Sequence, residues 1–211
     1  MVNISVNGGA AERLSPDRRR EHLLVHAVRV FSVRAYDEVT MASLALEAGV
    51  SKGLAFRYFS GKRELYLAAS TRMAEEVLAA SDPDPGLSAP ARFRTGLEAY
   101  LAMIEAQPHA LPSLAPGASS DPDVLALVQR VDEAIVARML SRMGALAGDR
   151  LLSETVGAWL VYVRASTHAW IQHGRVLPRE ELVCLQIGAF RGSIEAALRL
   201  GAAPGARLKL P

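Results

Sequence analysis

The sequence predicts an all-α protein with a small N-terminal helical domain followed by a larger one. Few segments alternate apolar and polar residues with a period of two, as a half-buried strand does. Alanine, leucine, arginine and glutamate, which are good helix formers, dominate the composition. Residues that cap helices stand just before several of the apolar-periodic segments, so the helices can be followed in order along the chain.

The first helix is expected to begin at Pro16. Ser15 can cap it, proline suits the first helical position, and Asp17 favours the positive end of the helix dipole. An apolar stripe follows, formed by Leu23, Leu24, Ala27, Val28 and Phe31. Because the stripe has helical spacing, this helix has one face to bury.

Two short helices and a longer one come next. Thr40 can cap the first, and Gly49 ends it because glycine tolerates the left-handed conformation of a tight turn. Ser51 can cap the second, and Ser60-Gly61 breaks it. The expected spans are 41–48, 51–59 and 62–80. The expected inward side chains of the two short helices are Leu44, Ala45, Ala55 and Phe59.

A segment rich in proline, Ser81 to Pro90, is expected to separate two domains. Beyond it the sequence predicts helices over 90–107, 121–144, 151–173 and 178–200, and a short irregular helix over 108–117. The predicted organisation is a disordered N-terminal tail (1–15), a three-helix domain (16–61), a connecting helix (62–80), a larger domain (81–200) and a C-terminal tail (201–211).

Composition narrows the class of protein without identifying a partner. The chain has 211 residues, is 50% hydrophobic and carries a net charge of +2, so it can bury a core. Cys184, the only cysteine, excludes an intrachain disulfide, and we expect it to pack inertly in its apolar stretch. We see no signal peptide, and the longest apolar run, Val156 to Val163, is too short for a membrane span. We expect a cytoplasmic protein.

Basic and aromatic residues gather in the stretch GVSKGLAFRYFSGK, residues 49–62. Two short helices joined by a glycine turn, with a helix before them, form a helix-turn-helix, whose second helix enters the major groove of DNA. Here that helix begins at Ser51, and its first exposed residues are Lys52, Gly53 and Leu54. Lys62 and Thr40 stand at starts of neighbouring helices, where the backbone N–H groups and the dipole favour a phosphate.

The segment TMASLALEAGVSKGLAFRYFSGKREL (40–65) resembles the DNA-binding domain of the TetR family of bacterial transcriptional regulators. The resemblance runs from Pro16 to about Ala69, and its specific parts are the AxxAGVSKG turn, the RYF ending and the lysine that follows. It implies a helix-turn-helix DNA-binding domain plus a larger helical ligand-binding and dimerisation domain. It also implies a homodimer that binds a palindromic operator in double-stranded DNA and releases it when a small-molecule effector binds. Repression is the commoner mode in the family, so we expect a repressor.

The resemblance implies DNA contacts position by position. Thr40 and Lys62 would contact phosphate, while the residues between them would lie at the groove. The complete set is Thr40, Ser51, Lys52, Gly53, Leu54, Phe56, Arg57, Tyr58 and Lys62. Two residues depart from the family pattern. Leu54 replaces a common hydroxyl residue and can only pack on a thymine methyl, and Phe56 lacks the hydroxyl of a common tyrosine.

The last two helices each carry two apolar sides, whereas a surface helix needs one. We expect one side to face the core and the other to face a second copy of the chain, in a four-helix bundle. The expected interface residues are Gly157, Val161, Ala165, Ala189, Gly192 and Ala196. The alternative is that these helices are simply central to their own domain.

Aromatic and apolar residues of the larger domain are expected to surround an effector cavity. The candidate ligand-binding residues are Tyr100, Met103, His109, Trp159, Tyr162, Val163 and Trp170. Aromatic walls with few polar groups suit a lipophilic or aromatic ligand. The alternative is that most of these residues are ordinary core. The stretch 108–117 would couple the cavity to the DNA-binding domain.

Other functional classes have weaker support in the sequence. His22 and His26 have the spacing of metal ligands on a helix, but no cysteine or carboxylate is patterned to complete a site, so we expect no metal or cofactor. Arg18, Arg19 and Arg20 either approach the DNA backbone or are surface charges. No catalytic grouping is supported by its spacing. The alternatives are a dimeric helical interaction protein without specific DNA readout, and an enzyme on a helical fold.

Overall fold

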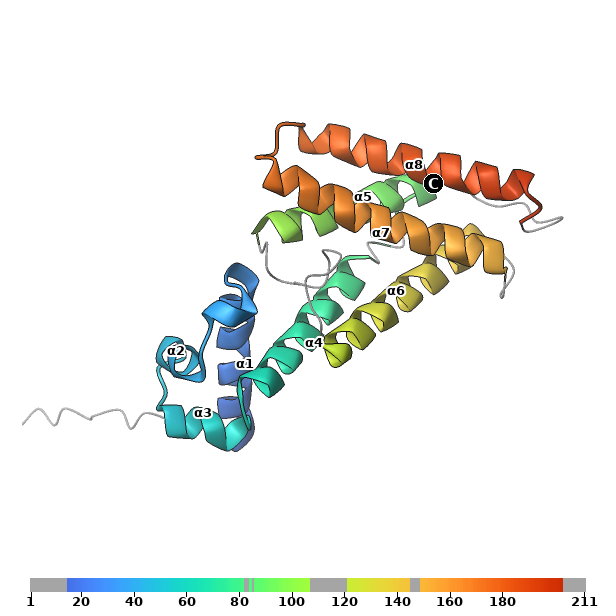
Figure 1. Ribbon diagram of the computed structural model, residues 1–211. Coiled ribbons are helices and arrows are strands. Elements are labelled where there is room, and N and C mark those ends of the chain that lie inside the picture. The colour runs from blue at the N-terminus through green and yellow to red at the C-terminus, as the bar shows by residue number, and fades with distance from the viewer. Residues whose placement is uncertain (1–14, 82–83, 85, 107–120, 145–148, 203–211) are drawn as a thin grey trace, which may run out of the picture.

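The computed structural model describes residues 15–81, 84, 86–106, 121–144 and 149–202. Within these ranges the chain is helical and contains no strand, which confirms the predicted all-α class (Figure 1). The elements in order are α1 (Pro16–Val33), the 3₁₀ turn η1 (Tyr36–Glu38), α2 (Met41–Glu47), α3 (Lys52–Tyr58), α4 (Lys62–Ala80), α5 (Ala89–Ala106), α6 (Pro122–Met143), α7 (Arg150–Gln172) and α8 (Arg179–Arg199).

The helix starts follow the predicted capping chemistry. The side chains of Ser15, Thr40 and Ser51 accept hydrogen bonds from the backbone N–H groups three residues later. Gly49 turns the chain after α2 with a φ of 65°, in the left-handed region that glycine adopts without steric cost. The observed ends of the long helices lie within one residue of the predicted ones. The short helix η1 was not predicted, and the stretch 108–117 lies outside the described residues.

Helices α1 to α4 form the head of the molecule, and its core continues into α6. Phe31, Ala55, Phe59 and Leu65 are at most 1% exposed. The same cluster of buried side chains includes Val124, Leu127 and Val131 from the first half of α6. Figure 1 shows why, because α4 and α6 run side by side from the head towards the other helices. The head therefore shares its core with α6.

Helices α5 to α8 form the body. Figure 1 shows α7 and α8 side by side and antiparallel, next to α5. Their core contains a cluster of three rings, in which Phe190 lies 4.8 Å from Phe93 and 4.9 Å from Trp159 between ring centroids. Trp159 Nε1 donates a hydrogen bond of 2.8 Å to the backbone carbonyl of Gln186, which holds the indole in place. Gln186 is itself fully buried, and its Nε2 donates to the hydroxyls of Ser166 and Thr167.

One expectation about packing needs correction. Cys184, which we expected to pack in its apolar stretch, is exposed on α8, and its Sγ lies 3.7 Å from Arg94 Nη2. The neighbouring Leu185 is also exposed, at 56%, while Leu182 and Ile194 are buried in the core. None of the described helices is both long enough and apolar enough to cross a bilayer.

Candidate functional site

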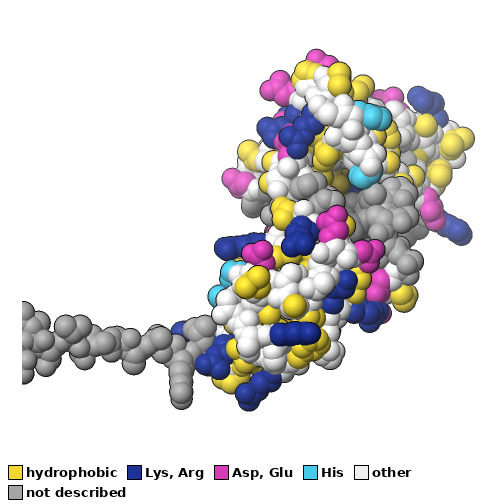
Figure 2. Space-filling model, turned by 60° about the vertical axis from the view of Figure 1, so that its left-hand side comes forward, with side chains coloured by type: hydrophobic (Ala, Val, Ile, Leu, Met, Phe, Trp, Pro, Cys, Tyr) yellow, Lys and Arg dark blue, Asp and Glu magenta, His cyan; other side chains and the backbone are white. Residues whose placement is uncertain are grey.

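The second helix of the helix-turn-helix, α3, packs on the core through a few side chains and leaves one side exposed. Ala55 and Phe59 are the buried pair, at 0% and 1% exposure, as predicted. Lys52, Gly53, Phe56 and Arg57 are exposed, and Leu54 and Tyr58 are half-buried. Figure 2, which brings this side of the molecule forward, shows Lys and Arg side chains along the lower part of the head, away from the body. The exposed residues of α3 therefore form a basic and aromatic surface.

The turns on either side of α3 are fixed by side chains. His22 of α1 makes a 2.9 Å hydrogen bond through Nε2 to the carbonyl of Ala48, which ties α1 to the end of α2. After α3, the backbone N–H and hydroxyl of Ser60 donate to Glu64 Oε2 at 2.7 and 2.8 Å. These two hydrogen bonds hold the pKa of the Glu64 carboxyl below its usual range. The orientation of α3 is thus set from both ends.

Lys62 is engaged within the head. Its Nζ donates a 3.0 Å hydrogen bond to the carbonyl of Tyr36 and lies 3.8 Å from the centroid of the Tyr36 ring. The side chain is half-buried. Lys62 therefore joins the start of α4 to η1, in addition to the phosphate contact that the sequence predicts.

Other predicted DNA-contacting residues have local partners as well. The Thr40 hydroxyl caps α2 by accepting from the N–H of Ser43 at 3.1 Å. Lys52 Nζ lies 5.8 Å from the centre of the Phe56 ring, so both side chains stand on one side of α3. Arg20 stacks over the ring of Phe59 at 4.6 Å. Arg20 is therefore a packing residue of the head as well as a surface charge.

An ion-pair cluster links the start of α4 to the start of α6. Arg63 donates from Nε and Nη2 to the two oxygens of Asp121, at 2.7 and 2.9 Å, and from Nη2 to Asp123 at 2.5 Å. Asp121 is also the N-cap of α6. The hydrogen bonds from Arg63 lower the pKa of Asp121. Sequence patterns did not predict this cluster, because its members lie 58 and 60 residues apart.

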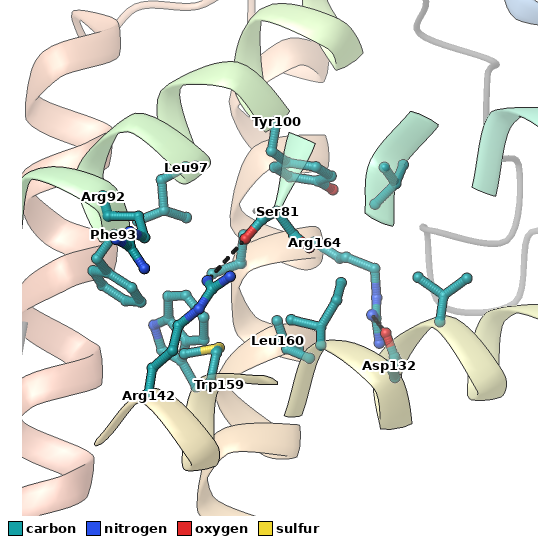
Figure 3. Close-up of a pocket in the computed structure, with 16 residues that line it drawn as sticks. Ser81, Arg92, Phe93, Leu97, Tyr100, Asp132, Arg142, Trp159, Leu160 and Arg164 are labelled. Carbon is teal, nitrogen blue, oxygen red and sulfur yellow. Dashed lines mark hydrogen bonds and ion pairs between the residues drawn. The ribbon is translucent and has the colours of Figure 1, made fainter. Parts of the chain in front are cut away.

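The body contains a mainly apolar cavity of about 110 Å³ between α4, α5, α6 and α7 (Figure 3). We call it the inner cavity. Its lining residues are Val77, Ser81, Arg92, Phe93, Gly96, Leu97, Tyr100, Val131, Asp132, Ile135, Met139, Arg142, Trp159, Leu160, Val163 and Arg164. A second pocket of about 330 Å³, which we call the outer pocket, shares four of these residues with it, namely Arg92, Phe93, Met139 and Arg142. The two spaces therefore adjoin.

Polar groups enter the inner cavity at a few points. Arg164 Nη1 pairs with Asp132 Oδ1 at 2.5 Å, and the Arg164 side chain is only 13% exposed. Burial raises the pKa of the Tyr100 phenol, so its hydroxyl stays protonated at physiological pH. Arg142 Nη1 donates to the carbonyl of Ser81 at 3.3 Å. The apolar run Val156 to Val163 ends at Arg164, and this is the one sequence signal that pointed to a charge beside the core.

The structure brings together some of the predicted ligand-binding residues. Tyr100, Trp159 and Val163 line the inner cavity. Met103 packs instead against the core that the head shares with α6, and Trp170 packs near the α7–α8 turn, where its Nε1 donates to the carbonyl of Leu177. Tyr162 is 40% exposed on the outer side of α7. These three residues do not line the cavity, and His109 lies outside the described residues.

The predicted interface residues lie along the outer side of α7 and α8. Val161 is 47% exposed, and Gly192 is exposed with open space around the position of a Cβ. The remaining four, Gly157, Ala165, Ala189 and Ala196, are half-buried. Two of the six, Ala189 and Ala196, line a shallow groove between the two helices. Its other lining residues are Leu151, Thr155, Ala158, Trp159, Tyr162, Ser193, Ala197 and Leu200. The outer side of this helix pair is thus strongly apolar.

The histidine pair of α1 lies apart from other metal-ligating groups. The rings of His22 and His26 are 4.6 Å apart, edge to face. Among the residues that the structure describes, no cluster of three or more His, Cys, Asp or Glu side chains is arranged to hold a metal ion.

Comparison with known proteins gives matches to both parts of the chain. The profile of the "Bacterial regulatory proteins, tetR family" matches residues 23–69. The HTH-type transcriptional activator FasR of Mycolicibacterium smegmatis is 30% identical over 179 residues, which cover 81% of this chain and 80% of that protein. The HTH-type transcriptional regulator BetI of Brucella anthropi is 44% identical, but over only 64 residues, 30% of this chain and 32% of that protein.

A solved structure extends the similarity to the arrangement of the helices. The crystal structure of a tetR-family transcriptional regulator from Streptomyces coelicolor superposes with a TM-score of 0.81 at 25% sequence identity. The superposition covers 89% of this chain and 85% of the other. The likeness therefore includes most of the body as well as the head.

Proposed function

This chain belongs to the TetR family of bacterial regulatory proteins, and from that we propose that it acts as a homodimer on a palindromic operator and responds to a small-molecule effector. As a member of the family it is a DNA-binding transcriptional regulator and not an enzyme. Because its target is bacterial DNA, its place of action is the cytoplasm. In this proposal residues 16–61 are the DNA-binding domain, α4 is the connecting helix, and residues 81–200 hold the effector and the dimer contact.

The observation that carries the DNA-binding proposal is the surface of α3. Two buried side chains, Ala55 and Phe59, fix the helix on the core, while Lys52, Gly53 and Arg57 remain exposed. The N-terminal residues of such a helix meet base edges in the major groove, and basic residues beside them meet phosphates. Leu54 and Phe56 supply apolar contacts, and Thr40, Ser51, Tyr58 and Lys62 flank the groove.

The test is selection of random duplexes against the purified full-length protein, followed by binding to the recovered sequence at several salt concentrations. We expect a palindrome. Arg57→Ala should weaken binding and reduce the slope of log affinity against log salt by about one, as loss of a single phosphate contact does. The control is Arg130→Ala, because Arg130 is exposed on α6 in the body. Recovery of no sequence, or equal effects of the two substitutions, would contradict the proposal.

The homodimer is supported by the apolar outer side of α7 and α8. A single head makes few contacts with DNA. The two heads of a dimer can bind two half-sites one helical turn of DNA apart, about 34–36 Å, or a larger multiple. The groove between α7 and α8, lined by small residues, lets helices of a second copy approach closely.

The effector response is supported by the inner cavity, with Tyr100, Trp159 and Val163 in its wall. A ligand shifts the protein between two states only if it binds one of them better. Release of DNA therefore requires that the occupied cavity favours a spacing of the two heads that fits the operator poorly.

For the direction of control we propose repression, with activation as the second candidate. Activation is favoured by one observation, the name of the M. smegmatis relative, which is a transcriptional activator. A reporter gene placed behind the selected operator separates the two. Output that falls when the protein is present and recovers with effector indicates a repressor, and output that rises with the protein indicates an activator.

A further inference from the structure

The polar end of the inner cavity has hydrogen-bond donors that the described residues do not use. Tyr100 reaches into the cavity from α5, and in Figure 3 its hydroxyl lies on the side of the Arg164–Asp132 pair. No hydrogen bond joins this hydroxyl to any residue in the described part of the chain. Because this hydroxyl lines the cavity and bonds no described residue, it can donate a hydrogen bond to an acceptor group of a ligand.

Arg164 offers further donors at the same place. Its contact with Asp132 engages only Nη1, and within the described residues its Nε and Nη2 make no hydrogen bond. A guanidinium carries five N–H donors in a planar fork that matches a carboxylate. Because the side chain is only 13% exposed, solvent screens its charge weakly. A second carboxylate can therefore bind Arg164 without displacing Asp132.

The lining of the inner cavity combines a few charged side chains with a largely apolar wall. The described lining contains three guanidiniums, those of Arg92, Arg142 and Arg164, and a single carboxylate, that of Asp132. The charges of Asp132 and Arg164 offset one another because they form an ion pair. The rest of the wall is aliphatic and aromatic, including Phe93, Leu97 and Trp159.

We propose that the effector is an organic acid. Its apolar part fills the inner cavity, and its carboxylate is bound by the Tyr100 hydroxyl and the Arg164 guanidinium. This inference rests on the proposed effector response and narrows its ligand class from lipophilic molecules in general to amphipathic acids. The inner cavity, at about 110 Å³, is of the order that holds a benzene ring. The apolar part of a longer acid would extend past Phe93 and Met139 into the outer pocket.

The experiment compares acids with alcohols that have the same hydrocarbon part. The pairs are octanoate with octanol, and phenylbutyrate with phenylbutanol. Binding to the full-length protein is measured by titration calorimetry, and release of the selected operator by fluorescence anisotropy. We expect each acid to bind about 10-fold tighter than its alcohol, because hydrogen bonds to a charged group are the stronger class. Equal affinity of acid and alcohol would overturn the proposal, as would no acid binding at about 1 mM.

Tyr100→Phe is the decisive variant, since it deletes only a hydroxyl that bonds no described residue and therefore leaves the fold intact. It should reduce the preference for acid over alcohol by about 10-fold. Asp132→Asn should raise acid affinity, because it removes the competing negative charge beside Arg164. Arg150→Gln is the control, because Arg150 lies on the same helix as Arg164 but its side chain is 92% exposed. An unchanged acid preference in Tyr100→Phe would refute the assignment of this hydroxyl.

The two readouts separate this inference from the function on which it rests. If the acids bind with the stated preference but neither series alters operator affinity, the effector response fails and the acid site stands. If alcohols release the operator and acids bind no better, the effector response stands and the acid assignment fails.

Discussion

At the scale of single residues, His26 links the stability of the head to pH. Burial, followed by the nearby charges of His22 and Arg29, holds the pKa of His26 below its ordinary value of 6.5, and Glu47 opposes them. Below pH 6.5 the His26 imidazole therefore binds a proton more readily in the unfolded chain than in the folded head. The free energy of unfolding should be unaffected by His26 above this pH and should fall as the pH drops from 6.5 towards the folded pKa.

The measurement is urea unfolding at about pH 7.5 and about pH 5.5, on either side of the histidine range. His26→Asn should reduce the loss of stability at the lower pH. His173→Asn is the control, because His173 is exposed at the end of α7. The control should lose as much stability on acidification as the unaltered protein. If His26→Asn also loses that much, His26 is not the group responsible.

The sequence predicts residue roles well where the cause is local. Ser15, Thr40 and Ser51 cap their helices because each acts on a backbone N–H three residues away. The contact of Lys62 with Tyr36, and that of Arg63 with Asp121, join residues 26 and 58 positions apart. Such pairs depend on how the helices pack, and no spacing in a single sequence specifies them.

At the scale of elements, α6 connects the cavity to the head. Its middle supplies Asp132 to the inner cavity, and its N-cap, Asp121, holds Arg63 at the start of α4. A movement of α6 on effector binding therefore acts on the residue next to Lys62. Arg63→Gln should leave effector binding unchanged but reduce the effect of effector on operator affinity, because the link from α6 to α4 is lost.

This coupling is measured as the ratio of operator affinities with and without a saturating effector. Arg72→Gln is the matched control, since Arg72 forms exposed ion pairs with Glu21 and Glu75 but makes none with α6. A ratio in Arg63→Gln equal to that of the control would show that the ion pairs carry no coupling.

The helices of the body were predicted nearly to the residue, whereas only some of the side chains that line the cavity were predicted. Tyr162 and Trp170 share helix α7 with Trp159 and Val163 but face other directions. Hydrophobic periodicity shows that a helix has two apolar sides, but it does not show which neighbour covers each side. The charged residues that line the cavity, Arg92, Asp132, Arg142 and Arg164, were missed because an apolar wall was expected.

At the scale of the whole molecule, DNA binding depends on assembly. Gly192→Glu adds a charge to the outer side of α8, at a position where a Cβ meets no atom within 4 Å of the same chain. The monomer should therefore fold normally but fail to pair. Operator affinity should fall by about 10²- to 10⁴-fold, the range gained by linking two binding modules.

Sedimentation gives the oligomeric state directly. Ala137→Glu is the matched control, because it places the same charge at an exposed position of α6. Gly192→Glu protein that sediments as a dimer would exclude this face of α8 from the interface.

The core that α1 to α4 share with Val124, Leu127 and Val131 of α6 limits how this protein can be recombined with its relatives. A chimaera joined at the end of α4 would pack α4 of one parent against α6 of the other. Their side chains would not be complementary along the contact between the two helices. Such hybrids should be recovered mostly as insoluble material. If the first half of α6 is exchanged together with the head, both sides of the α4–α6 contact come from one parent. This exchange is therefore the better way to transfer DNA specificity between regulators.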